Sequence, residues 1–139
     1  MTISTEIEIK APFYDVDSMG VVYHGNYVKY LEDARCALLE KIGYDYVAML
    51  ESGYAWPVVG INIKYISPIS FKQAVKVCVA LVEYEHCIKM KYTLSDAKTG
   101  KKIAKAETTQ MAINMNTMEA LYFSPKILLD KVREYLENA

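Results

Sequence analysis

Alternating apolar and polar residues predict a strand at the start of the chain. Between Ile3 and Phe13, isoleucines alternate with charged residues, which is the period-two pattern of a strand with one buried face. From about Asn26 to Ile42 the apolar spacing changes to a helical one. Gly43 follows and is expected to end the helix, because glycine readily adopts the left-handed conformation that closes helices. The residues on the apolar side of this helix are Tyr27, Tyr30, Leu31, Ala34, Leu38 and Ile42.

The segment from Val58 to Asn116 has the pattern of a sheet. Residues 61–65, 75–81 and 88–94 alternate apolar and polar side chains, and residues 103–114 are predicted to form the last long strand. Residues 96–100 form a turn between the last two strands. A terminal helix is expected to begin with Ser124 as its N-cap and Pro125 in its first turn. Its apolar stripe consists of Leu128, Leu129, Val132 and Leu136.

The order of these elements predicts an α+β fold. A strand, a long helix, four antiparallel strands and a terminal helix follow one another without a linker, repeat or low-complexity segment. One amphipathic helix packed on one antiparallel sheet gives a two-layer α+β architecture. A chain of 139 residues is long enough to bury a core of its own. We therefore expect a single domain over residues 1–139.

Composition narrows the classes of function. Charged residues make up 24% of the chain, and the formal net charge is −1. Nucleic-acid binding needs a basic excess on one face, so nucleic acid is not an expected partner. The chain shows neither the long apolar run of a membrane span nor the layout of a secretion signal, so we expect a cytoplasmic protein without stable membrane insertion. Cys36, Cys78 and Cys87 are predicted to be buried, reduced thiols.

The segment from Tyr14 to Tyr27, YDVDSMGVVYHGNY, joins the first strand to the long helix and admits several interpretations. It opens like a calcium loop, but Met19 and Asn26 stand where that loop needs oxygen ligands. The histidines and cysteines lack the spacing of a zinc site, so we expect no metal and no cofactor. Phosphoryl transfer would need a buried parallel strand before the aspartates, whereas these residues alternate. A turn whose aspartates only cap backbone N–H groups stays open as an interpretation.

A reaction site is the remaining interpretation. A capping turn does not require apolar residues and a ring between carboxylate and helix, as in Val21 to His24, whereas a lined pocket does. The first turn of a helix has unpaired N–H groups and a positive dipole end, which stabilise an oxygen that gains negative charge. If the chain reverses at Gly20, a buried Asp17 carboxylate can face this terminus across a substrate. Such a pair suits acyl hydrolysis without a metal.

The same segment, followed by YLEDAR from Tyr30 to Arg35, resembles the 4-hydroxybenzoyl-CoA thioesterase family. It is similar in particular to the bacterial acyl-CoA thioesterases associated with the Tol-Pal system. The segment IKYISP, from Ile63 to Pro68, fits a family strand that ends in a Y-x-x-P step. The resemblance covers nearly the whole chain. It implies a hotdog fold, in which an antiparallel sheet wraps a long central helix, and dimers, commonly paired into tetramers, with active sites at the subunit boundary.

The resemblance also implies roles for individual residues. Asp17 matches the family's catalytic carboxylate, described as nucleophile or general base. His24 matches the residue at the helix start whose backbone N–H holds the thioester carbonyl, and in the Tol-Pal subgroup this residue is itself a histidine with a catalytic role. The implied activity is hydrolysis of acyl-CoA thioesters to free acid and CoA; the alternative is a non-catalytic acyl-thioester-binding or scaffold protein on the same fold. The expected substrate-binding residues are Val22, Tyr23, Gly25 and Tyr27.

Overall fold

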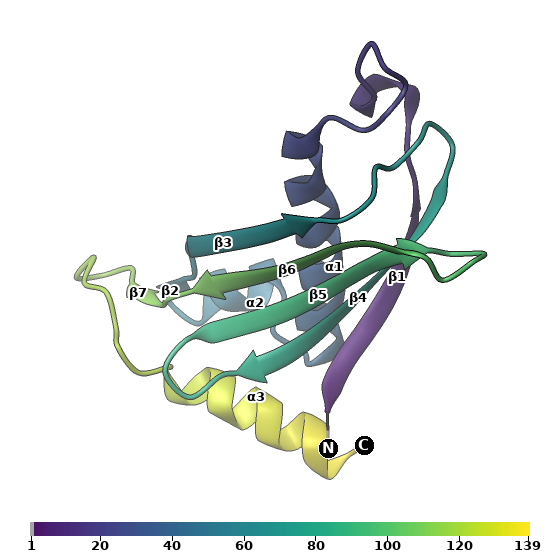
Figure 1. Ribbon diagram of the computed structural model, residues 1–139. Helices are drawn as coiled ribbons and strands as arrows, with labels where there is room; N and C mark the ends of the chain where they lie inside the picture. The colour runs from purple at the N-terminus through teal and green to yellow at the C-terminus, as the bar shows by residue number, and fades with distance from the viewer. Residues whose placement is uncertain (1) are drawn as a thin grey trace.

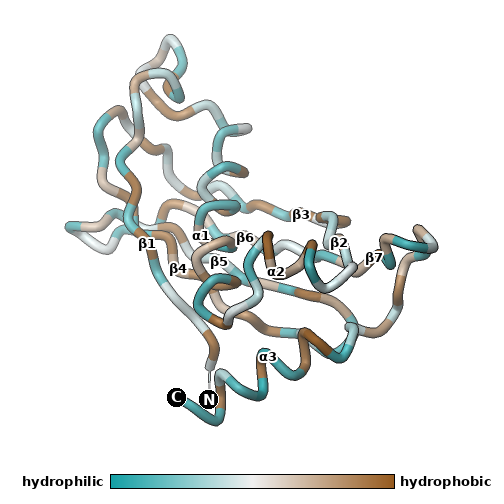
Figure 2. The backbone as a smooth tube through the Cα atoms, turned by 180° about the vertical axis from the view of Figure 1, so that it is seen from behind, coloured by the Kyte–Doolittle hydropathy of each residue, from teal (hydrophilic) through white to brown (hydrophobic). Residues whose placement is uncertain are grey.

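The computed structural model describes residues 2–139 and contains one main sheet, a small second sheet and helices. The main sheet has the strand order β1-β4-β5-β6-β3, and every neighbouring pair is antiparallel. Figure 1 shows α1 crossing behind this sheet, and Figure 2, seen from behind, shows α1 and α2 on the same side. The elements are β1 (Ile3–Lys10), α1 (Tyr27–Lys41), α2 (Tyr46–Glu51), β2 (Tyr54–Ala55), β3 (Val58–Tyr65), β4 (Ala74–Glu83), β5 (Ile88–Asp96), β6 (Lys102–Gln110), β7 (Ile113–Asn114) and α3 (Lys126–Glu137).

The long helix has the apolar side that its spacing predicts. Tyr27, Tyr30, Leu31, Ala34, Leu38 and Ile42 are all buried. A short 3₁₀ turn, His24–Asn26, precedes α1, so the α-helix itself begins one residue later than expected. The helix ends where Gly43 adopts a φ of +79°, and the N–H of Tyr44 donates to the carbonyl of Leu39 over 2.9 Å. This bond satisfies a carbonyl of the last helical turn. The predicted helix and its glycine stop are confirmed.

The sheet buries the face that α1 covers and leaves the other face to solvent. On β5, Ile88, Met90, Tyr92 and Leu94 are buried and alternate with more exposed residues. On β4, Val75, Val77 and Val79 are buried in the same way. Fully burying one such aliphatic side chain contributes roughly 1.5–3 kcal/mol, before the entropy cost of ordering it. The α+β architecture of an antiparallel sheet packed on a long helix, with a C-terminal helix, is confirmed.

Two predicted element boundaries are wrong. The last strand does not run to residue 114: β6 ends at Gln110, and β7 pairs instead with β2 in the second sheet. Pro57, between β2 and β3, has no N–H and cannot continue a ladder, which separates the two pairings. The Ser124 hydroxyl is buried and has no hydrogen-bond partner within residues 2–139, and the N-cap of α3 is Pro125.

The cysteines are free but not fully buried. Cys36 is exposed on α1, because it lies off the apolar stripe. Cys78 and Cys87 are half-buried. Cys78 lies on β4 directly opposite Glu6 of β1, and its thiol contacts that carboxylate. In residues 2–139, no helix has the length and apolar content needed to cross a membrane.

Candidate active site

The chain reverses direction at Gly20, as expected. Gly20 has a φ of +78°, which a residue with a Cβ adopts only with strain. The N–H of Asp17 donates to the carbonyl of Val21 over 2.8 Å, and the N–H of Gly20 returns to the carbonyl of Asp17 over 3.0 Å. The N–H of Val22 then donates to Ile69 over 2.7 Å, which ties this hairpin to the loop between β3 and β4.

The hairpin, the start of α1 and the end of β3 together enclose a cavity of about 360 Å³. Four of the six predicted site residues line it: Asp17, Val22, His24 and Tyr27. Tyr23 and Gly25 do not line the cavity. The sequence motif therefore folds so that its carboxylate and its histidine reach one space. The other lining residues are Val21, Tyr65, Ile66, Ser67 and Pro68.

The N-terminus of α1 presents free backbone donors at this cavity. In the described part of the chain, no backbone or side-chain acceptor receives a hydrogen bond from the N–H of His24 or of Gly25. The hydroxyl of Tyr65 donates to the carbonyl of His24 over 2.9 Å, which anchors this turn to β3. These two N–H groups and the positive end of the helix dipole are suited to hold a partly negative oxygen.

Gly25 and Tyr23 support this turn without lining the cavity. A Cβ on Gly25 would lie only 2.6 Å from Cε2 of the Tyr23 ring. The Tyr23 ring also packs on the His24 ring, with 4.4 Å between the centroids. Gly25 therefore lets an aromatic ring cover the backbone at the point where the donors are exposed. Tyr27 is buried, and its ring meets that of Tyr65 edge to face, with 4.9 Å between the centroids.

Asp17 is exposed, not buried as the sequence interpretation expected. Its Oδ1 accepts a 2.8 Å hydrogen bond from the N–H of Met19 inside the turn. This bond is the capping role of a turn-forming aspartate. Only one carboxylate oxygen is used in this way, so Oδ2 can act on a bound molecule. Asp17 is exposed because it lies in the turn of the hairpin, where residues 17–20 are all exposed.

Asp15 is a residue that the sequence interpretation did not single out. Its side chain is 3% exposed and contacts the ammonium of Lys29, while the hydroxyl of Tyr30 donates to it over 2.6 Å. Burial by itself raises the pKa of Asp15, but these two hydrogen bonds outweigh it and hold the pKa below its ordinary value. Its backbone carbonyl accepts from the N–H of Tyr23 and from the amide of Asn26. Asp15 thus ties the hairpin to α1, a role that its D-x-D spacing alone does not reveal.

In residues 2–139, no three His, Cys, Asp or Glu side chains are grouped so that they could hold a metal ion. The polar side chains that line the cavity are those of Asp17, His24, Tyr27, Tyr65 and Ser67. The model of the thioesterase-like superfamily matches residues 11–130. The chain belongs to this superfamily. Its architecture is the hotdog fold that the motif implied, and the Tol-Pal association stays a prediction.

Proteins named as CoA thioesterases are among those that the chain resembles. A Bacillus subtilis protein with the provisional name acyl-CoA thioesterase YneP is 36% identical over 77 residues, which are 55% of this chain and 56% of that protein. The match therefore spans little more than half of the relative's length. The DHNA-CoA thioesterase of Staphylococcus aureus has a TM-score of 0.81 and 28% identity, covering 97% of this chain and 94% of that one. The 1,4-dihydroxy-2-naphthoyl-CoA thioesterase Slr0204 of Synechocystis shares the fold, with a TM-score of 0.83 at 19% identity over 94% and 96% of the two chains.

Proposed function

We propose that the protein hydrolyses acyl-CoA thioesters to the free acid and CoA at the cavity lined by Asp17 and His24. One observation carries this proposal: Oδ2 of Asp17, which has no partner among residues 2–139, shares a cavity of about 360 Å³ with His24 at the N-terminal end of α1. Membership of the thioesterase-like superfamily and the similarity to named CoA thioesterases support the same class of reaction.

In the proposed reaction, the thioester carbonyl oxygen accepts hydrogen bonds from the N–H groups of His24 and Gly25. Asp17 either attacks the carbonyl carbon or removes a proton from the water that attacks it. The carbonyl oxygen becomes negative, the carbon–sulfur bond then breaks, and CoA leaves as a thiolate that takes up a proton. If Asp17 is the nucleophile, water hydrolyses the resulting anhydride and regenerates the carboxylate. One oxyanion donor typically contributes about 3–4 kcal/mol, and a positioned base roughly 10²–10⁴ in rate.

We further propose that the protein acts as a dimer paired through β3. Within the described chain, β3 pairs with β6 on one side and leaves its other edge open. Val59 and Ile61 on this strand are 57% and 45% exposed, and Lys64 is its only charged residue. An open, apolar edge strand is a template for another strand. A two-fold axis through such an edge gives a closed, isologous contact. The expected tetramer stays a prediction.

This pairing would complete the active site. If β3 pairs antiparallel with its copy about Ile61 and Asn62, Val58 of one protomer lies opposite Tyr65 of the other. The two ends of the strand are about 23 Å apart at 3.3 Å per residue. The Asp17 cavity lies at the Tyr65 end, so the partner would cover it from its own Val58 end. Such cover would remove Asp17 from bulk solvent during the reaction, which strengthens its electrostatic role.

The deciding experiment uses Asp17→Asn with release of the CoA thiol followed by absorbance. The asparagine carbonyl can still accept the bond from Met19, so the turn should persist while the base is lost. We expect turnover to fall at least 100-fold with an unchanged urea midpoint. Asp130→Asn, on α3, is the matched control and should retain full turnover. Retention of more than a tenth of the rate by Asp17→Asn would refute the catalytic role.

The alternative is a non-catalytic acyl-thioester-binding or scaffold protein. The hydrogen bond from the N–H of Met19 to Asp17 favours this alternative, because a turn with a purely structural role would keep the bond without catalysing a reaction. The same assay separates the two functions. A binding protein would show saturable affinity for acyl-CoA thioesters but no thiol release above the uncatalysed rate, with or without Asp17.

A further inference from the structure

Tyr65 is the last residue of β3, and its side chain reaches the turn that precedes α1. Its hydroxyl donates a hydrogen bond to the carbonyl of His24 over 2.9 Å. The N–H of Tyr27 donates to the same carbonyl. The His24 oxygen therefore has two donors, one from the helix and one from the sheet, and the sheet donor lies 41 residues away along the chain.

The position of this sheet donor is fixed by packing and by backbone bonds. The Tyr65 ring meets the Tyr27 ring with 4.9 Å between the centroids and the His24 ring with 6.1 Å, both close to edge to face. The N–H groups of residues 66 and 67 both donate to the carbonyl of Ile103, over 2.9 and 3.0 Å, and hold the end of β3 on β6. A hydroxyl on a ring with these contacts loses little further freedom when it binds the turn.

The carbonyl that Tyr65 holds belongs to the peptide unit that also carries the N–H of Gly25. This unit is trans, so its C=O and N–H point in opposite directions. A donor that fixes the carbonyl therefore also fixes the direction of the Gly25 N–H, one of the two groups proposed to receive the thioester oxygen. The bond from Tyr65 also polarises the unit, because hydrogen bonds in a chain strengthen one another, and the N–H becomes a better donor.

We propose that Tyr65 is a positioning residue for the hydrolysis: its hydroxyl holds the peptide between His24 and Gly25 so that the free N–H groups of the turn meet the negative oxygen of the transition state. This inference rests on the proposed function. The hydroxyl acts through the backbone, since its proton is already used by His24. The contribution grows as the oxygen becomes negative, so it belongs to kcat more than to KM.

The experiment uses Tyr65→Phe, which keeps the ring and removes only the hydroxyl. With an acyl-CoA thioester, we expect kcat to fall about tenfold, the upper range for one neutral hydrogen bond, while KM changes by less than about twofold. The dithioester of the same acyl group and CoA has a sulfur in place of the carbonyl oxygen, and sulfur is a weak acceptor. With this substrate, Tyr65→Phe should lower kcat by a clearly smaller factor, because the two changes affect the same interaction.

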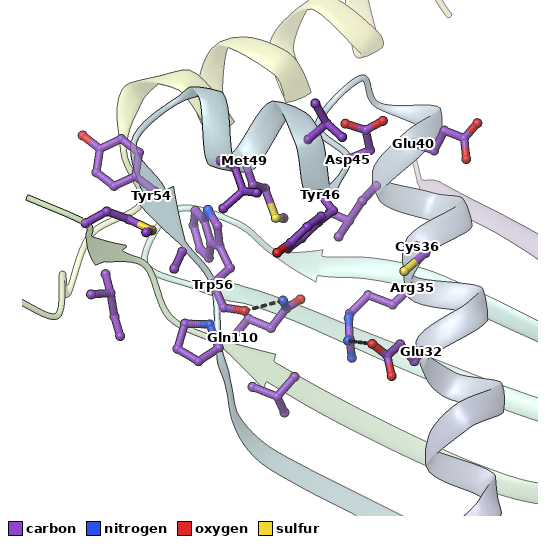
Figure 3. A pocket seen from close by; sticks show the side chains of 18 of the residues that line it. Glu32, Arg35, Cys36, Glu40, Asp45, Tyr46, Met49, Tyr54, Trp56 and Gln110 are labelled. Carbon is purple, nitrogen blue, oxygen red and sulfur yellow. Dashed lines mark hydrogen bonds and ion pairs between the residues drawn. The ribbon is translucent and has the colours of Figure 1, made fainter. Parts of the chain in front are cut away.

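Tyr44→Phe is the matched control, because it also removes a tyrosine hydroxyl that is hydrogen-bonded. The Tyr44 hydroxyl accepts from Nε1 of Trp56 over 3.1 Å. Figure 3 shows Trp56 in the wall of a second cavity, of about 760 Å³, beside α1 and α2. No residue of the described chain lines both this cavity and the one at Asp17. Tyr44→Phe should therefore lower the urea midpoint but keep kcat.

Hydrogen exchange followed by NMR tests the anchor without any turnover. The N–H of Asn26 donates to the carbonyl of Tyr23, and that of Tyr27 donates to His24, so both report opening of the turn. Tyr65→Phe should accelerate their exchange by up to about tenfold, whereas the amides of β5 should keep their rates.

An unchanged kcat in Tyr65→Phe would overturn the proposal, and so would an equal loss of kcat with the thioester and the dithioester. A loss that appeared only in KM would assign the hydroxyl to substrate binding and would also overturn it. The proposed hydrolysis fails separately, through a lack of thiol release by the unsubstituted protein. In that case the exchange rates of Asn26 and Tyr27 still decide whether Tyr65 holds the turn.

Discussion

The hydroxyl of Tyr30, on α1, donates a 2.6 Å hydrogen bond to the buried carboxylate of Asp15, in the segment that leads to the hairpin of Asp17. This bond joins the segment before the hairpin to α1, and residues of the hairpin and of the start of α1 line the proposed active site. Burial raises the pKa of Tyr30, and the adjacent Asp15 carboxylate raises it further. The tyrosine therefore stays protonated and remains a donor at every physiological pH.

Replacing Asp15 should weaken the fold in a way that depends on pH. Its folded-state pKa lies below the ordinary value of about 3.9, so the unfolded chain binds the proton more readily and stability rises with pH through this range. The contribution is fully present above the unfolded-state pKa and is lost as the pH falls through the folded-state pKa. We expect Asp15→Asn to cost about 2–3 kcal/mol at pH 7, from urea unfolding.

At a pH below the folded-state pKa, the same substitution should cost much less, because the native carboxyl is then protonated. Tyr30→Phe removes one of the two side-chain bonds and should cost less than Asp15→Asn at pH 7. If Asp15→Asn lowered the free energy of unfolding equally at pH 7 and in acid, the lowered pKa of Asp15 would be contradicted.

The ring and the backbone at the start of α1 can be tested separately. If only the backbone N–H of His24 acts, His24→Ala keeps turnover; a fall of 100-fold or more in kcat would instead assign the ring a catalytic part.

Gly25→Ala forces the Tyr23 ring away from the turn, since the new Cβ would lie 2.6 Å from Cε2. We expect kcat to fall while stability changes by less than about 1 kcal/mol, because Tyr23 is half exposed and can move.

Adding Tyr23→Ala to Gly25→Ala removes the clash and should restore most of the lost turnover. The Tyr23→Ala single variant is the control for loss of the ring itself. No recovery in the double variant would show that the clash is not the cause.

The open edge of β3 predicts the oligomeric state. Ile61→Lys places a charge in the middle of this edge and should convert the dimer to a monomer in sedimentation velocity, because a lysine on an edge strand opposes pairing with another strand. Turnover should fall with the dimer if the partner covers Asp17. Thr93→Lys, on the exposed face of the central strand β5, should leave the β3 pairing intact. A monomeric wild-type chain would rule out the paired site.

Cys87 should be an unreactive thiol. Burial raises its pKa, and the Glu83 carboxylate that its Sγ contacts at 3.2 Å raises it further, to about 11. At pH 8 the thiolate fraction is then on the order of a hundredfold below that of a free cysteine with a pKa of about 8.5. We expect alkylation by iodoacetamide, followed by peptide mass spectrometry, to be slower by this factor. Glu83→Gln should accelerate it, and equal rates in the two proteins would contradict the role of Glu83.

The periodicity of the chain was sufficient to predict the long helix and the alternating strands of the main sheet. The spacing from Tyr27 to Ile42 predicted α1, because a stripe repeating every 3.6 residues is buried only as a helix. The alternation in residues 88–94 predicted β5 for the equivalent reason. The D-x-D motif and the turn at Gly20 also located part of the Asp17 cavity, since five of its nine lining residues lie within one short hairpin and one helix start.

Tertiary structure decided the remaining features. The Tyr65 to Pro68 segment reaches the Asp17 cavity because the loop after β3 hydrogen-bonds the hairpin, a contact between segments more than 40 residues apart. In the sequence, Gln110 is one more polar residue on a strand. Only the structure shows that its Nε2 binds the carbonyl of Trp56 and that its buried Oε1 has no donor within residues 2–139. Local sequence patterns report what each segment buries, because periodicity depends on neighbours along the chain. Which polar groups meet depends on the sheet register and loop paths, and these are determined by contacts across the whole fold.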